Sequence, residues 1–308
     1  MMQNLGIKLK YIYLPFLLIA LAFIIGYNFL YWLFIIQFGI SFQYLDTVQI
    51  ILPNLLAWVP VLIWLQKRLK LLKLDPNSRA HFLFLQLAVF AIGIPACIAQ
   101  FYFEEVCGKC TALETIEQIN NVPRTKFYTI KKYGLDLFHY TDYQTYYTSG
   151  KNNQNLELEF YIAIPIFTTP NDTNSKDCKA YLSYKYLKTL DANNSDLKPK
   201  DRLALFVEES LKDYWQTDFS EFTYLEYLRP IQKNYYAAQN DSRYNSKNAV
   251  VFDAHYTPFE SRADEIQLYL IGSLGIGFLL WFFILLFPKI NISNLELLMS
   301  GKTYKINP

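Results

Sequence analysis

The sequence predicts a membrane protein with four transmembrane α-helices and one extracytoplasmic α+β domain inserted between the third and fourth spans. Three observations predict this fold class: four long uncharged segments, one long insert with both strand-like and helix-like patterns, and basic residues concentrated on one side of the expected membrane. A composition that is 52% hydrophobic and only 18% charged excludes an ordinary soluble globule. The net charge of +2 argues against a nucleic-acid partner, which would require a basic face.

The four uncharged segments are each long enough to cross a bilayer. They occupy residues 11–37, 48–65, 82–102 and 266–287, and the first three make up a membrane region over 1–102. A helix of about 18 residues crosses a hydrocarbon core of roughly 30 Å at about 1.5 Å per residue. None of the segments contains Asp, Glu, Lys, Arg or His, so a transporter with a charged pathway is disfavoured.

The basic residues next to these segments predict the orientation. Ten of them lie on one side, with only Asp75 and Glu296 as acids, so that side carries a net +8 and the rest of the chain −6. They are Lys8, Lys10, Lys67, Arg68, Lys70, Lys73, Arg79, Lys289, Lys302 and Lys305. Because short cytoplasmic loops are enriched in Lys and Arg, both termini and the tail 288–308 are expected in the cytoplasm.

The insert, residues 103–265, is long enough for one compact domain with its own core. Residues 156–166 alternate Leu, Phe and Ile with other side chains, which predicts a strand with one buried face. Residues 199–215 place apolar side chains at helical spacing, which predicts an amphipathic helix packed on a sheet. Aromatic and β-branched runs predict further strands at 126–133, 179–187 and 249–256.

Cys107-Gly108-Lys109-Cys110 is the one redox-like motif and allows two interpretations. The pair Cys107 and Cys110 could serve a membrane thiol-disulfide oxidoreductase. Such a motif normally lies between a strand and a helix, whereas this one follows an expected membrane helix. We therefore favour a structural disulfide between two of Cys107, Cys110 and Cys178, formed in an oxidising compartment.

The sequence predicts no catalytic residue, metal or cofactor. The histidines His81, His139 and His255 are scattered, and no run matches a serine-hydrolase, zinc-protease or phosphate-loop motif. Ser273 lies near glycines such as Gly277, as the serine of an intramembrane protease does, but no predicted span supplies a histidine base for it. Small residues four apart instead predict close packing against another helix.

An aromatic cluster in the insert has two interpretations. It comprises His139, Tyr140, Tyr143, Tyr146 and Tyr147, interrupted by polar residues. Exposed aromatic side chains beside polar groups are typical of ligand and protein interfaces. A strand also buries about half of its side chains and favours aromatic residues, so core tyrosines are the alternative.

Six short strings resemble the N-terminal, non-protease membrane region of certain bacterial rhomboid-family membrane proteins. They are SGKN at 149–152, YIAIPI at 161–166, FVEES at 206–210, FTYLE at 222–226, PFESR at 258–262 and LLFPK at 285–289. None of the strings contains a catalytic motif, so no catalytic residue is transferred. The resemblance implies a bacterial inner-membrane location and an accessory role beside a separate partner.

These observations together predict a non-enzymatic membrane protein. Its external domain is expected to bind or sense a protein, peptide or envelope ligand, with a membrane protease or envelope complex as the associated partner. The thiol-disulfide oxidoreductase based on Cys107 and Cys110 is the alternative.

Overall fold

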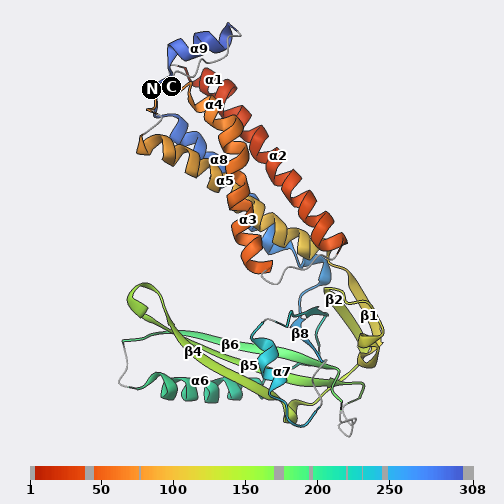
Figure 1. Cartoon of the computed structure of the whole chain (residues 1–308). Coiled ribbons are helices and arrows are strands. Elements are labelled where there is room, and N and C mark those ends of the chain that lie inside the picture. Colours follow the sequence, from red (N-terminus) through yellow and green to blue (C-terminus); the bar gives the residue numbers. More distant parts are fainter. Residues whose placement is uncertain are drawn as a thin grey trace. The chain divides into compact units, whose positions relative to one another are not determined.

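A computed structural model of the chain describes residues 4–38, 45–75, 78–169, 177–193, 197–219, 221–230, 232–244 and 249–300 (Figure 1). The chain forms two compact units. The helical unit comprises Met1–Cys107 and Arg262–Pro308, and the sheet domain comprises Gly108–Ser261. The sheet domain is thus shorter at both ends than the predicted insert, because the flanking helical segments reach further than the uncharged sequence.

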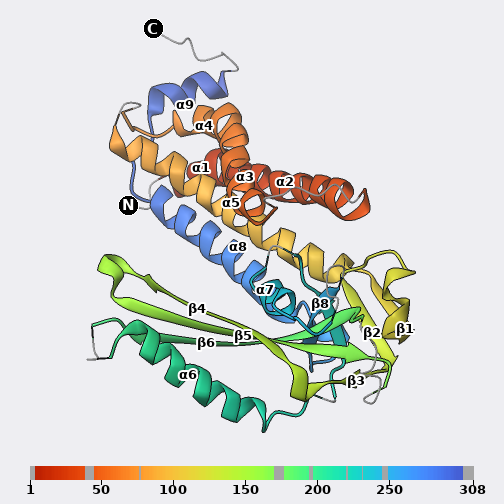
Figure 2. The same cartoon turned by 60° about the horizontal axis from the view of Figure 1, so that its bottom comes forward.

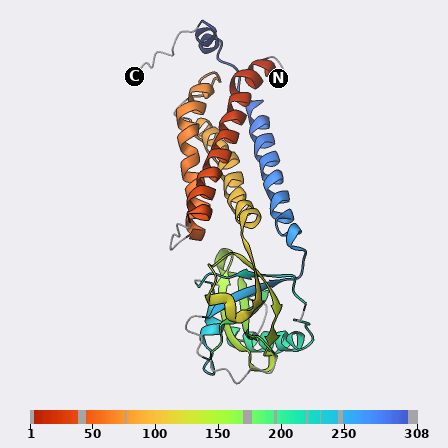
Figure 3. The same ribbon diagram turned by 90° about the vertical axis from the view of Figure 1, so that its right-hand side faces the viewer.

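Four helices of the helical unit are long and apolar enough to cross a membrane (Figure 3). They run over Leu5–Gln37, Gln49–Leu69, Arg79–Cys107 and Phe259–Leu285. Their α-helical parts are α1 (Leu5–Lys8), α2 (Leu14–Tyr31), α3 (Leu45–Pro60), α4 (Gln66–Leu69), α5 (Arg79–Cys107) and α8 (Asp264–Leu285). A short helix, α9 (Ile292–Met299), follows the fourth.

The second helix changes its hydrogen-bonding period next to a proline. Pro53 and Pro60 both lie inside α3, and a π-helical turn, Val61–Leu65, follows directly. Proline has no N–H for the helical ladder, and extra residues in a helical turn commonly occur where the ladder is interrupted. The α-helix then resumes as α4, so that one long helix runs over Gln49–Leu69.

Helix α5 is the centre of the helical unit, since it packs against α2, α3 and α8. Many of its side chains are small, including Ala88, Ala91 and Ala96, which lets neighbouring backbones approach closely. On α8, Trp281 is only 1% exposed and stacks on Phe16 of α2 with ring centroids 4.1 Å apart. Aromatic stacking therefore joins the first and fourth long helices.

Two sets of backbone contacts close one end of the helical unit. The Lys8 Nζ donates to the carbonyl oxygens of Leu285 and Leu286 at 2.7 and 2.9 Å, and so caps the C-terminus of α8. The segment after α8 pairs with the segment after α4, where the Lys73 N–H donates to the Lys289 carbonyl at 2.7 Å. These contacts fix the chain between the end of α8 and the start of α9.

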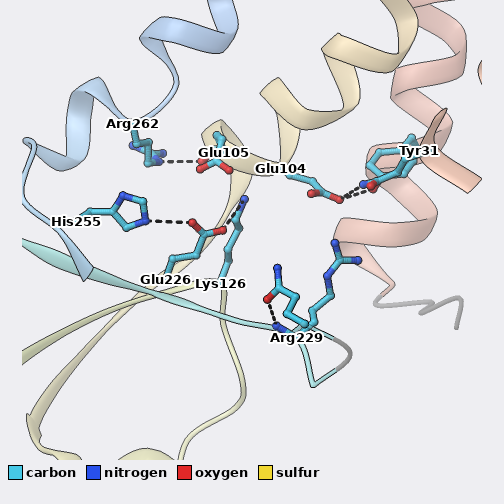
Figure 4. Close-up of polar contacts among 10 residues, drawn as sticks. Tyr31, Glu104, Glu105, Lys126, Glu226, Arg229, His255 and Arg262 are labelled. Carbon is cyan, nitrogen blue, oxygen red and sulfur yellow. Dashed lines mark hydrogen bonds and ion pairs between the residues drawn. The ribbon is translucent and has the colours of Figure 1, made fainter. Parts of the chain in front are cut away.

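The opposite end of α5 is capped by a residue from the start of the fourth long helix. The Arg262 guanidinium donates to the carbonyl oxygens of Glu105 and Val106 at 2.8 and 2.9 Å (Figure 4). A cation favours the partial negative charge of a helix C-terminus. The two chain segments that lead into the sheet domain consequently leave the helical unit beside one another.

The sheet domain is built on one curled mixed sheet (Figure 2). Its strands are β1 (Cys110–Thr115), β2 (Phe127–Lys132), β3 (Gly134–Leu135), β4 (Thr141–Ser149), β5 (Asn155–Phe167), β6 (Ala180–Asp191), β7 (Tyr224–Tyr227) and β8 (Val250–His255). The order is β1-β2-β7-β8-β6-β5-β3, and β4 also pairs with β5. The β1/β2 and β6/β8 pairs are parallel, and the other pairs are antiparallel.

Two helices pack on the sheet and determine which strand faces are buried. Helix α6 (Pro199–Tyr214) packs on β4 and β5 through its apolar stripe, which includes Leu203 and Phe206. Helix α7 (Asn234–Gln239) contacts the same two strands, with Tyr235, Ala237 and Ala238 buried beside the odd-numbered side chains of β5. The sequence predicted one buried face for β5, but both faces are buried from Glu159 onward because α7 covers the second face.

The long periodic segments of the insert coincide with strands β2, β5, β6 and β8 and with helix α6. The short elements β1, β3, β7 and α7 were not predicted. β3 and β7 have only two and four residues, and α7 is shorter than two helical turns, so no repeating pattern stands out. β1 is as long as β2 and β8 but lacks their aromatic side chains. The conformation of these short elements depends on the longer strands beside which they lie.

Candidate functional site

The five residues of the aromatic cluster lie at the start of β4 and along it, but they do not form one surface. His139 ends a short 3-10 turn, and its Nδ1 lies 2.7 Å from the buried carboxylate of Asp136. The Tyr140 ring packs on Tyr214 at the end of α6, with ring centroids 5.1 Å apart. The Tyr143 ring packs on Tyr236 of α7, with ring centroids 5.2 Å apart. Tyr140 and Tyr143 thus pack against helices near the beginning of the strand, whereas the His139 side chain is exposed and paired with Asp136.

Tyr146 and Tyr147 are the two exposed tyrosines of the cluster, at 43% and 46%. Their side chains leave opposite faces of β4, since successive strand residues alternate. The Lys233 Nζ lies 4.9 Å from the centre of the Tyr147 ring and 2.6 Å from the Glu159 carboxylate. The negative charge of Glu159 raises the pKa of Tyr147 above its ordinary value, so the phenol stays neutral.

Strand β4 lies at an edge of the sheet, because β5 is its only strand partner among the described residues. The direction of the β4 backbone groups follows from two hydrogen bonds of the neighbouring β5 segment. The Gln154 carbonyl accepts from Ala192 on the β6 side, and the Pro165 carbonyl accepts from Asp136 on the opposite side. Odd-numbered residues of β5 therefore point their N–H and C=O toward β4. In the register they face odd-numbered residues of β4.

The even-numbered residues of β4 consequently direct their N–H and C=O groups away from the sheet. The Asp142 carbonyl shows this directly, because it accepts from the Asn240 side chain of the α7 segment at 2.9 Å. Beyond it, Gln144, Tyr146 and Thr148 present the same groups. In the described part of the chain no donor or acceptor meets these outward groups. We call the backbone of these three residues the open edge.

The open edge has distinct limits at both ends. At one end α7 covers the strand, where the Thr141 hydroxyl donates to the Ala237 carbonyl at 2.8 Å. At the other end the strand turns at Gly150, whose φ of 78° is a left-handed conformation that glycine adopts without strain. Asn152 and Asn153 also have positive φ, so the turn is built from residues that tolerate it.

The open edge lacks the features by which edge strands usually prevent association. Such strands carry Lys, Pro, an inward-facing charge or a bulge. Residues 143–149 contain only Tyr, Gln, Thr and Ser, and their pairing with β5 runs without an interruption. β-Branched and aromatic residues also favour the extended conformation. The segment is thus suited to accept a further strand.

A polar cluster lies elsewhere in the sheet domain, and the sequence analysis did not anticipate it. The Glu226 carboxylate lies 3.2 Å from the His255 Nε2 and 3.5 Å from the Lys126 Nζ (Figure 4). Tyr224 stacks flat on His255 with centroids 4.6 Å apart. Asp253 is opposite Glu226 in the β7–β8 register. The four charged side chains come from β7, from β8 and from the residue just before β2, and local sequence does not reveal that these segments meet.

The two carboxylates of this cluster differ in their affinity for protons. Burial raises the pKa of Glu226, but the His255 hydrogen bond and the Lys126 charge outweigh burial and hold it below its ordinary value. Burial raises the pKa of Asp253, and the charges of His255 and Lys185 only partly oppose this effect. Such divergence occurs at acid–base sites and also in ion-pair networks that support a fold. Glu226 is paired here with both His255 and Lys126, so the cluster forms an ion-pair network in this structure.

No disulfide joins any two of the four cysteines, all of which lie among the described residues. Cys107 ends α5 and Cys110 begins β1, and the disulfide predicted from their motif stays a prediction. Cys178 is buried, its thiol donates to the Ala180 carbonyl at 3.0 Å, and burial raises its pKa to about 11. A thiol held protonated is a poor nucleophile. Across the described residues, no three His, Cys, Asp or Glu side chains cluster as metal ligands would.

Gly277 lies against α5, whereas Ser273 bonds within its own helix. A Cβ on Gly277 would lie 3.2 Å from the Ala91 Cα and 3.3 Å from its Cβ. The Ser273 hydroxyl donates to the Leu270 carbonyl at 2.9 Å. Gly272 and Gly275 on the same helix have no heavy atom within 4 Å of such a Cβ. Close helix approach therefore depends on one glycine of this segment.

The helical unit contains a charged group that the sequence analysis placed outside the spans. Helix α5 continues past the predicted end at residue 102 and includes Glu104. Its carboxylate accepts from the Tyr31 hydroxyl and, at 2.5 Å, from the buried Gln49 side chain (Figure 4). The uncharged segment 82–102 is thus only part of α5, which also contains Arg79, His81 and Glu105. A run of uncharged residues marks an apolar segment, whereas the end of a helix is set by where its backbone hydrogen bonds stop.

Comparisons with family models, with curated proteins and with solved structures give no match for this chain. The argument for function consequently depends on the residues and the geometry described above.

Proposed function

We propose that this chain is a non-enzymatic membrane protein whose sheet domain binds an extended segment of a protein partner by strand addition at the open edge. The observation that supports this proposal is the row of outward N–H and C=O groups at Gln144, Tyr146 and Thr148. In strand addition, main-chain hydrogen bonds give affinity and alternating side chains give specificity. Tyr146 and Tyr147 would contact the added strand from opposite faces.

The proposed location is the bacterial inner membrane, with both termini in the cytoplasm and the sheet domain outside. The four long apolar helices and the excess of basic residues on one side support this arrangement. In a background with Cys107 and Cys110 replaced by serine, we would introduce single cysteines at Lys70 and Asn193. Impermeant thiol reagents on whole cells should label the Asn193 variant alone. Labelling of only the Lys70 variant would contradict the proposed orientation and support the opposite one.

The resemblance to the membrane region of rhomboid-family proteins supports an accessory role beside a membrane protease or envelope complex. The oxidoreductase alternative would need a second cysteine pair to exchange electrons with Cys107 and Cys110. The remaining two, Cys97 and Cys178, belong to different units, and both are buried. This separation favours the binding role.

Proline substitution provides a selective test of strand addition. The Gln144 N–H points outward and is not needed for pairing with β5, so Gln144→Pro should remove one edge donor while β4 remains in the sheet. Gln144→Thr is the matched control, because it keeps the N–H and favours a strand. A photoreactive phenylalanine analogue at Tyr147, in native membranes, should give a protein adduct with the control and lose it with proline.

Two results would contradict strand addition. One is an adduct that persists unchanged in the Gln144→Pro background, since backbone pairing would then play no part. The other is an absence of protein adducts with the wild-type edge. Thr145→Pro serves as a check on the design: its N–H faces β5, so this substitution should unfold the β4–β5 pair, whereas Gln144→Pro should not.

A further inference from the structure

The open edge offers a fixed and small set of hydrogen-bonding groups. Gln144, Tyr146 and Thr148 each contribute one N–H and one C=O. Asp142, the next outward residue, is excluded because its carbonyl already accepts from the Asn240 side chain. A partner strand that satisfies every open group must therefore centre on Tyr146, the middle of the three.

We infer that the strand added at this edge is β4 of a second copy of the chain, paired antiparallel about a two-fold axis through Tyr146. This inference rests on the proposed strand addition and names its partner. In this register Tyr146 faces Tyr146 of the second copy, and Gln144 faces Thr148. Each outward residue then exchanges bonds with an outward residue, so all open N–H and C=O groups of both copies are satisfied.

An alternative two-fold register, centred on Thr145, leaves groups unpaired. It would place Gln144 opposite Tyr146 and Thr148 opposite Asp142. The Asp142 carbonyl is already bonded to Asn240, and α7 covers that end of the strand. The Thr148 groups would then compete with an existing contact. Complete pairing of the backbone selects the register centred on Tyr146.

The side chains also match in the selected register. On one face the exposed Tyr146 rings of the two copies lie opposite each other, flanked by Gln144 and Thr148. On the other face Thr145 lies opposite Tyr147. Aromatic pairs and pairs of aromatic with β-branched residues are among the stabilising cross-strand combinations. Tyr146, Thr145 and Tyr147 thus each face a side chain with which they form a favourable cross-strand pair.

The charge distribution favours a second copy over a charged peptide. In a two-fold antiparallel pair the central residue faces its own equivalent and its neighbours face one another across the axis, so an uncharged strand pairs with itself without like-charge repulsion. Residues 143–149 carry none. The acids of β5 on this side already have partners: Glu157 accepts from the Ser149 and Thr189 hydroxyls, and Glu159 is paired with Lys233. Residues 143–149 themselves offer no charge to an acidic or basic peptide.

Cysteine crosslinking tests both the partner and the register. Hydrogen-bonded residues opposite each other have Cα atoms about 5.5 Å apart, within the range of about 4.4 to 6.8 Å that a disulfide spans. In the full chain in native membranes, with Cys107 and Cys110 replaced by serine, Tyr146→Cys should form a disulfide-linked dimer under mild oxidation. Gln144→Pro should abolish that dimer, and Gln144→Thr should preserve it.

Thr145→Cys supplies the register control, since Thr145 faces Tyr147 of the second copy and not itself. The single variant should stay monomeric, whereas Thr145→Cys combined with Tyr147→Cys should crosslink. A dimer from Thr145→Cys alone, without one from Tyr146→Cys, would overturn the register. An absence of crosslinks from all these variants would overturn self-pairing. If the Tyr147 photo-adduct to a different protein nevertheless remained sensitive to Gln144→Pro, strand addition would stand and only the partner would be wrong.

Discussion

The two units of this protein bury polar side chains in opposite ways. In the sheet domain the buried Asp241 carboxylate accepts from the Tyr181 hydroxyl and from the N–H groups of Arg243 and Tyr244. In the helical unit the Gln100 side chain is fully buried, yet neither of its amide atoms has a hydrogen-bond partner. Buried polar groups in folded proteins are nearly always bonded, so the difference needs a physical reason.

All the unpartnered buried side-chain atoms of the described residues belong to the helical unit. Besides Gln100, they are the amide oxygens of Asn28, Gln49 and Asn54 and the Nδ1 of His81. In the sheet domain, polar contacts hold irregular loops in place and so each has a defined partner. The helical unit is instead held by close contacts of small and aromatic residues. The comparison predicts that polar substitutions reduce stability most in the sheet domain and that steric substitutions reduce it most in the helical unit.

The largest expected effect is that of Asp241→Ala in the sheet domain. The substitution leaves the buried Tyr181 hydroxyl and two backbone N–H groups without an acceptor, at about 3 kcal/mol of unfolding free energy in total. Pulse proteolysis of the detergent-solubilised full chain across a urea series measures the loss. Asp201→Ala, at an exposed position of α6, is the control and should cost under about 1 kcal/mol. Equal losses would show that the carboxylate is not a structural acceptor.

A steric change should have the next largest effect, in the helical unit. Gly277→Leu forces a side chain into the space occupied by Ala91 and should cost about 2 kcal/mol through overpacking. Gly275→Leu on the same helix is the matched control, because nothing lies within 4 Å of its Cβ position. Thermal unfolding in detergent compares the two. Similar transitions for both variants would mean that α8 does not pack closely at Gly277.

A smaller effect, of opposite sign, is expected from Asp253→Asn in the polar cluster. Burial raises the folded-state pKa of Asp253 above its unfolded value, so ionisation destabilises the fold as pH rises through the folded pKa. The amide avoids this cost, and the variant should be more stable than wild type at pH 7. His255, Lys185 and Glu226 remain as its charged neighbours. The advantage should shrink as pH falls through the raised pKa of folded Asp253, where the wild-type carboxyl becomes protonated. A gain that does not change with pH would refute the electrostatic explanation.

The smallest effect should come from Gln100→Leu. Removing an unpartnered buried amide and keeping its volume should change the unfolding free energy by less than about 1 kcal/mol, or raise it. Gln100→Ala should be clearly worse, because it leaves a cavity where the side chain was. The same thermal measurement applies. If leucine were as harmful as alanine, the amide would have a partner essential to the bundle, and the contrast between the two units would fail.

Sequence by itself determined the long elements of this protein. Uncharged stretches predicted the four long helices, and periods of two and 3.6 residues predicted β5 and α6, because burial of one face repeats along a regular element. Of the five residues proposed as a ligand surface, the structure leaves Tyr146 and Tyr147 well exposed and packs Tyr140 and Tyr143 against helices. Local sequence cannot distinguish these tyrosines, since all four belong to one aromatic run.

Only the tertiary structure decided where the open edge lies. Gln144 and Thr148 contribute backbone groups that any residue possesses, so no side-chain pattern marks them. β4 and β5 form a local hairpin, but the outer side of β4 stays open because no other strand among the described residues pairs with it, and this depends on how the whole sheet assembles. The same reason explains Glu104 and the cluster around Glu226. A charged residue near a helix end or on a short strand gains its hydrogen-bond and ion-pair partners only when the fold brings distant segments together.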